Sequence, residues 1–118
     1  MNELDVNNYL LKEDLFILFK NQLKKDFESS GLSVDFVDSL PRDFDLLKQR
    51  VMSAIEPLIS SNSSLLAILV YRIDISELQL AKYQKQNPFM AHAELLSELV
   101  IKRILQKIIL RKTFSINK

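Results

Sequence analysis

The stretch from residue 87 to 112, NPFMAHAELLSELVIKRILQKIILRK, restricts the fold of this chain more than any other. Asn87 is a residue type that caps helix N-termini, and Pro88 suits the first helical position because its fixed φ angle already fits a helix. No glycine or proline follows Pro88. The stretch therefore predicts a helix of about 25 residues, roughly 37 Å long.

The apolar side chains of this predicted helix do not form a single stripe. At 100° per residue they spread over most of the circumference, which indicates a helix contacted on several sides rather than one lying on a surface. They are Leu95, Leu96, Leu99, Val100, Ile101, Ile104, Leu105, Ile108, Ile109 and Leu110. We therefore expect this helix to be the centre of a small helical bundle.

The rest of the chain predicts further helices. One glycine and three prolines in 118 residues favour long regular elements, and the length suits a single domain covering residues 1–118. The prediction is an all-α bundle of four to five helices, in which residues 1–8 are frayed or loosely docked. Asn7 or Asn8 would cap a helix over 9–29 that ends at Gly31. Its apolar face would comprise Leu11, Leu15, Phe16, Leu18, Phe19, Leu23 and Phe27.

The middle of the chain predicts two helices separated by proline. A short helix over 33–40 would bury Phe36, Val37 and Leu40, and Pro41 would close it. A longer amphipathic helix over 42–55 would kink or stop near Pro57, because proline removes a hydrogen bond and clashes with the preceding turn.

Residues 60–64 predict a polar turn, and the segment after it is ambiguous. Residues 65–73 contain β-branched and aromatic residues in near alternation, which is also typical of a strand. A lone strand would have no partner in a helical chain, so we favour a helix. The run Asp74-Ile75-Ser76-Glu77 resembles a capping box and predicts a further helix over 75–86.

The charges are distributed unevenly along the chain. Residues 1–56 hold eleven acidic and seven basic side chains, a net charge of −4, whereas residues 57–118 hold four acidic and nine basic ones, a net charge of +5. Every charged residue after Glu98 is basic. Arg103, Lys107 and Arg111 recur every four residues and line one helix face, with Lys112 beside them. These four residues are the candidate site for a protein partner or for nucleic acid.

Three interpretations of this basic row remain open. It would neutralise the phosphates of a nucleic acid, bind a protein partner (the acidic N-terminal half of the same or another chain included), or be merely solvated. Apolar residues in the same sector and the favourable helix dipole at a C-terminus argue against nucleic acid. A helix-turn-helix formed by 75–86 and 88–112 is disfavoured, because its recognition helix would be largely apolar.

Other candidate chemistry is sparse. His92 is the only histidine and lacks a metal-ligand pattern around it, while Asp35, Asp38, Asp43 and Asp45 are better explained as caps and solvated side chains. The chain contains no cysteine, which excludes disulfides and thiol catalysis. We therefore expect no catalytic residue, no cofactor and no metal ion.

The leading hypothesis is a non-enzymatic protein–protein interaction or assembly domain, by self-association or with another protein. Phe114 and Ile116 would extend a docking patch beyond the last helix. The alternatives are a nucleic-acid-binding protein and, third, a small enzyme whose site is not visible in sequence. The acidic start and the lack of a long uncharged segment predict a cytoplasmic protein that does not enter a membrane.

Overall fold

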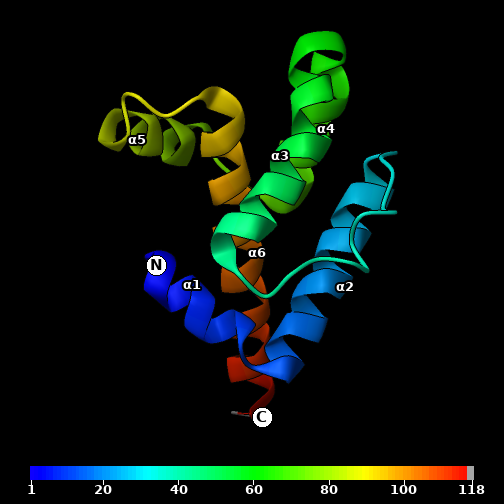
Figure 1. Cartoon of the computed structure of the whole chain (residues 1–118), viewed down its shortest axis with the longest axis vertical. Helices are drawn as coiled ribbons and strands as arrows, with labels where there is room; N and C mark the ends of the chain where they lie inside the picture. The colour runs from blue at the N-terminus through cyan, green and yellow to red at the C-terminus, as the bar shows by residue number, and fades with distance from the viewer. Residues whose placement is uncertain (117–118) are drawn as a thin grey trace.

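The 25-residue helix α6 (His92–Ile116) runs through the middle of the computed structural model and contacts each of the other helices (Figure 1). The structure describes residues 1–116, and for residues 114–116 the backbone alone. Within that range the chain is all-α, as predicted, but it forms six helices rather than four to five. The other five are α1 (Glu3–Leu10), α2 (Glu13–Ser29), α3 (Phe44–Ser61), α4 (Ser63–Ile73) and α5 (Glu77–Gln86).

The aliphatic side chains of α6 are buried on several sides, which confirms its predicted central position. Each of the buried ones is less than 5% exposed: Leu95, Leu96, Val100, Ile101, Ile104, Leu105 and Ile108. Leu110 differs and is 53% exposed. Burial of one such side chain contributes about 1.5–3 kcal/mol, so this helix supplies much of the core.

The predicted start of this helix at Asn87 and Pro88 is wrong, since α6 begins at His92. Asn87 instead ends α5: its backbone N–H and its side-chain amide both donate to the Tyr83 carbonyl, at 3.0 and 2.9 Å. Pro88 then lies in a turn closed by the hydrogen bond from Met90 N to Asn87 O. The absence of glycine and proline downstream lets α6 extend four residues beyond the predicted end at 112.

Residues 1–8, predicted to be frayed or loosely docked, include most of α1. The Asn2 side chain accepts from Asp5 N at 2.9 Å, and the Asp5 carboxylate accepts from Asn2 N at 3.1 Å, which forms a capping box. Val6 and Leu10 are fully buried and dock this helix. Asn7 does not cap α2, because its side-chain oxygen accepts from Phe44 N at 2.8 Å and ties α1 to α3.

Helix α2 ends as predicted, at the only glycine. Gly31 has φ +79°, and the bonds from Leu32 N to Phe27 O and from Gly31 N to Glu28 O are both 3.0 Å. This is the Schellman arrangement that favours glycine after a helix. Two residues of the predicted apolar face do not enter the core: Leu11 lies between α1 and α2 and is 68% exposed, and Leu18 is 40% exposed.

The predicted helix over 33–40 does not form. Two successive turns take its place, closed by bonds from Val37 N to Val34 O and from Leu40 N to Val37 O. Such a short helix has little stability of its own, and the turns already bury the side chains of Val37 and Leu40.

Pro57 does not end α3, which continues to Ser61. Ile55 and Leu58 lie on either side of this proline in sequence and are both buried, so packing maintains the helix across it. The predicted polar turn over 60–64 is shorter than expected, and only Asn62 separates α3 from α4. Asn62 ends α3 and caps α4, because its side chain accepts a hydrogen bond from Leu65 N at 3.2 Å.

The ambiguous segment 65–73 is helical and belongs to α4. Asp74 ends that helix in the left-handed conformation, with φ 68°. The capping box of α5 is therefore formed by Ser76 and Gln79, not by Asp74 and Glu77 as the sequence predicts.

A charge placed in the core of α6 should prevent folding. We expect Ile104→Asp or Leu105→Asp to lower the free energy of unfolding by more than about 4 kcal/mol, because both sites are fully buried and offer an aspartate no partner. Urea unfolding followed by circular dichroism measures the change. The matched control is Leu110→Asp on the same helix, which should change the free energy by less than about 1 kcal/mol; equal melting of all three variants would contradict the central placement.

Candidate functional site

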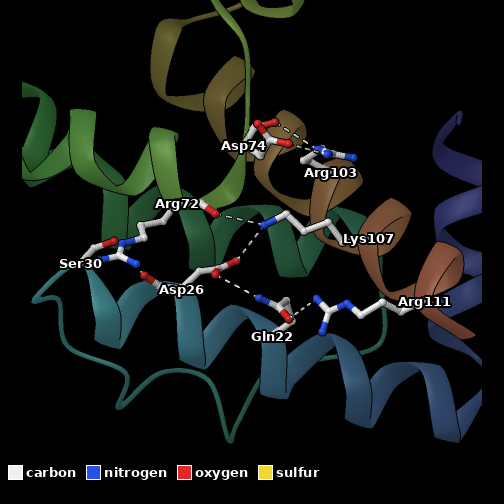
Figure 2. A network of polar contacts seen from close by, with 8 residues as sticks. All are labelled: Gln22, Asp26, Ser30, Arg72, Asp74, Arg103, Lys107 and Arg111. Carbon is white, nitrogen blue, oxygen red and sulfur yellow. Dashed lines mark hydrogen bonds and ion pairs between the residues drawn. The ribbon is translucent and has the colours of Figure 1, made fainter.

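The predicted basic row faces the rest of the chain. Arg103, Lys107 and Arg111 extend from α6 toward α2 and toward the end of α4 (Figure 2). Arg103 makes two contacts with Asp74, from Nη2 to Oδ2 at 2.9 Å and from Nε to the backbone oxygen at 3.1 Å. This side chain therefore holds the left-handed residue that ends α4.

Lys107 occupies the most protected part of the row. Its Nζ lies 3.4 Å from Oδ2 of Asp26 and donates to the Arg72 carbonyl at 3.1 Å. Asp26 is buried and also accepts from Gln22 Nε2 at 3.0 Å. The Lys107 ammonium thus joins α6 to the buried carboxylate of Asp26 on α2 and to the backbone near the end of α4 (Figure 2).

The last two residues of the row also contact α2. Arg111 donates from Nη2 to the Gln22 side-chain oxygen, and Lys112 pairs with Asp14. Each predicted site residue thus has a partner within the chain, and two of the four partners are carboxylates of α2. The uneven charge distribution serves, at least in part, to attach the basic C-terminal helix to the acidic N-terminal half.

A second polar cluster lies beneath α5. Glu98 is buried and accepts from the Tyr83 hydroxyl and from Lys48 Nζ, the latter at 3.1 Å. Lys102 Nζ donates to the Tyr83 oxygen at 2.8 Å and lies 3.9 Å from Glu98. Two cations and a phenol thus surround one carboxylate.

The electrostatics of this cluster shift two pKa values. Burial raises the pKa of Tyr83, and the hydrogen bond to Glu98 and the charge of Glu98 raise it further. Burial lowers the pKa of Lys48, but the hydrogen bond to Glu98 and the negative charges of Glu98, Glu94 and Asp45 together outweigh burial, so that this pKa lies above its ordinary value. Both groups keep their protons through the neutral range.

This cluster attaches α5 to the bundle. None of the ten residues of α5, all of which the structure describes, is buried, and among the described helices α5 contacts α6 alone. Figure 1 shows it lying to one side. This cluster was not identified from the sequence, since the predicted helix over 75–86 was assigned no polar contact. The available signal was the i, i+4 series Glu94, Glu98 and Lys102, which places charge on a helix otherwise rich in aliphatic residues.

A groove with an apolar floor lies between α2 and the second half of α6. Its volume is about 680 Å³, and Ile17 and Leu18 on its α2 side are 48% and 40% exposed. The lining residues are Asp14, Ile17, Leu18, Asn21, Gln22, Lys25, Ile108, Arg111 and Lys112. On α2 these positions recur at intervals of three and four, so they form a second stripe beside the core face. Sequence reasoning placed Leu18 in the core and did not consider Ile17.

The remaining candidates have ordinary surroundings. His92 is the exposed first residue of α6, and Asp43 caps α3 by accepting from Leu46 N at 3.0 Å. Asp35, Asp38 and Asp45 are exposed. Within residues 1–116 no group of three or more histidine, aspartate and glutamate side chains is arranged to hold a metal ion.

Comparisons with protein-family models, with curated proteins and with solved structures gave no significant match. In the described part of the chain, no helix combines the length and the apolar character that crossing a bilayer requires. Any functional conclusion therefore depends on the geometry of the groove and of the two polar clusters.

Removing the Tyr83 hydroxyl should destabilise the protein in a pH-dependent way. We expect Tyr83→Phe to lower the free energy of unfolding by about 1 kcal/mol at pH 8. Because the folded state holds the phenolic proton more tightly than the unfolded chain, this stabilisation is complete below pH about 10, the ordinary tyrosine pKa, and declines above it. Urea unfolding at pH 8 and pH 11 should show a smaller difference from the wild type at the higher pH.

The control for this variant is Tyr71→Phe, since Tyr71 is 83% exposed. That substitution should leave stability unchanged at pH 8. An equal loss of unfolding free energy for Tyr83→Phe at pH 8 and at pH 11 would contradict the assigned role of the hydroxyl.

The two acidic partners on α2 should differ in their contribution to stability. We expect Asp26→Ala to cost about 2–3 kcal/mol, because it leaves Lys107 and Gln22 without their buried acceptor. Asp14→Ala should cost less than about 1 kcal/mol, since its pair with Lys112 is exposed. Thermal or urea unfolding measures the stability of both variants. A similarly small loss of stability in the two would mean that Lys107 is not held by Asp26.

Proposed function

We propose that this protein is a non-enzymatic protein–protein interaction domain that binds an apolar segment of a partner protein in the groove between α2 and α6. The observation that carries the proposal is the partly exposed pair Ile17 and Leu18 beside Ile108. These side chains come from two helices and form the floor of one open groove of about 680 Å³. Apolar surface gathered in a groove is typical of a binding site, whereas single exposed apolar residues are not.

The composition of the groove favours a protein ligand over the two alternatives. A nucleic acid bound through the basic row would have to displace Asp26 from Lys107 and Asp74 from Arg103. It would also place phosphates against aliphatic side chains. An enzyme would need converging reactive polar groups, yet His92 is exposed. Among the titratable residues that line the groove, Asp14 pairs with Lys112, and Arg111 bonds to Gln22. The side chains of Phe114 and Ile116 lie outside the described residues and take no part in the proposal.

Selection from a display library of helical peptides tests the proposal even while the partner is unidentified. The wild-type protein should enrich peptides with large apolar residues at intervals of three and four. The affinity of the enriched peptides for the Leu18→Asp variant should be at least tenfold lower than for the wild type, because this variant places a charge on the groove floor. Titrations followed by methyl NMR should move the signals of Ile17, Leu18 and Ile108.

The matched control is Leu46→Asp, the same substitution on the surface of α3, where the leucine is 57% exposed. It should retain binding. Enriched peptides that bind the wild type and Leu18→Asp equally would overturn the assignment of the groove. Saturable binding of duplex or single-stranded oligonucleotides, with no peptide binding, would favour the nucleic-acid alternative.

A further inference from the structure

We propose that the segment bound in this groove is an amphipathic helix whose apolar stripe is flanked by carboxylates. The inference rests on the proposed function and names the chemistry of the partner. Two features of the described surface carry it: the charge around the groove and the length of the surface on which the groove lies.

The charges at the edge of the groove are predominantly positive. Lys112 is paired with Asp14, so these two charges offset each other. Arg111 donates to the neutral amide oxygen of Gln22, which leaves its charge uncompensated. Lys25 is exposed and forms no ion pair with any other residue that the structure describes. Two positive charges therefore remain beside the apolar floor, and acidic side chains on a ligand would complement them.

The surface extends beyond the groove along α2. A neighbouring hollow shares Asn21 and Lys25 with the groove and continues to Ser29. Its lining residues are Asn21, Lys24, Lys25, Glu28 and Ser29. Together the two hollows follow α2 from Asp14 to Ser29, about 22 Å at 1.5 Å per residue. This length matches a partner helix of about four turns.

A helix fits this surface better than an extended peptide does. The groove is formed by two helices whose backbone donors and acceptors are used internally, so it provides no sheet edge for an added strand. Apolar side chains spaced three and four residues apart on a ligand helix would contact Ile17, Leu18 and Ile108. Carboxylates beside that stripe would lie near Lys25 and Arg111.

Two synthetic helical peptides of the same length test the inference. Both carry leucine at three- and four-residue intervals; one has glutamate beside the leucines, and the other has lysine at the same positions. The acidic peptide should bind the wild-type protein at least tenfold more tightly in 50 mM salt, and the difference should shrink in 500 mM salt. Isothermal titration calorimetry or fluorescence anisotropy measures the affinity of each peptide at each salt concentration.

Charge reversal at the edge of the groove supplies the second comparison. Lys25→Glu should lower the affinity for the acidic peptide by about two- to fivefold, the scale of one exposed ion pair. The same variant should raise the affinity for the basic peptide. The control is Lys85→Glu on α5, which lies outside the groove and should change neither affinity. Unfolding measurements on both variants check that the fold is intact.

The failure of this inference is distinguishable from failure of the proposed function. Equal binding of the two peptides, competitive with each other and lost in Leu18→Asp, would overturn the acidic partner while leaving a groove that binds apolar helices. The same holds if neither peptide binds but library-selected peptides without carboxylates beside their apolar residues do. If no peptide of any kind binds the groove, both proposals fail. A second copy of this chain in the groove would appear as a dimer mass that Leu18→Asp abolishes, and it would also contradict the inference.

Discussion

The burial of aliphatic side chains all around α6 is the constraint on which this structure depends. Helices of a small domain normally keep one polar face toward water, but α6 is contacted by five other helices and keeps few of its large side chains exposed. Helices α1, α2, α3 and α4 each bury apolar side chains in the core around α6, whereas α5 buries none. The fold is therefore arranged around one helix, and its polar residues serve mainly to orient the neighbours.

Those polar residues form two buried attachments with different geometry. Asp26 lies on α2 and receives Lys107 from α6, whereas Glu98 lies on α6 and receives Lys48 from α3 and Tyr83 from α5. In the described part of the chain, every buried side-chain nitrogen and oxygen atom has a hydrogen-bond partner. The charges that suggested a functional surface in the sequence thus have a structural role. The groove that we propose as the binding site owes its character to aliphatic residues that the charge pattern did not reveal.

The longer helices, in which apolar residues recur periodically, could be predicted from sequence, and so could α5 from the run that resembles a capping box. Helix α1 and the exact helix ends could not, because they depend on particular side-chain bonds. The central position of α6 and the end of α2 at Gly31 followed from periodicity and from the only glycine. Asn87 was assigned to the wrong helix because an asparagine is equally suited to either end, and the choice depends on which backbone groups are near it. The groove could not be predicted, because the exposure of Leu18 depends on how α2 crosses α6.

The one-sided attachment of α5 has a consequence for the behaviour of the molecule. A helix with no buried residue, held to a single neighbouring helix by the partly buried Leu80 and by Tyr83 with its ionic surroundings, has a low free energy of local unfolding. Its amide hydrogens should exchange with solvent well before those of α6. This region would then detach and re-dock while the remaining helices stay folded.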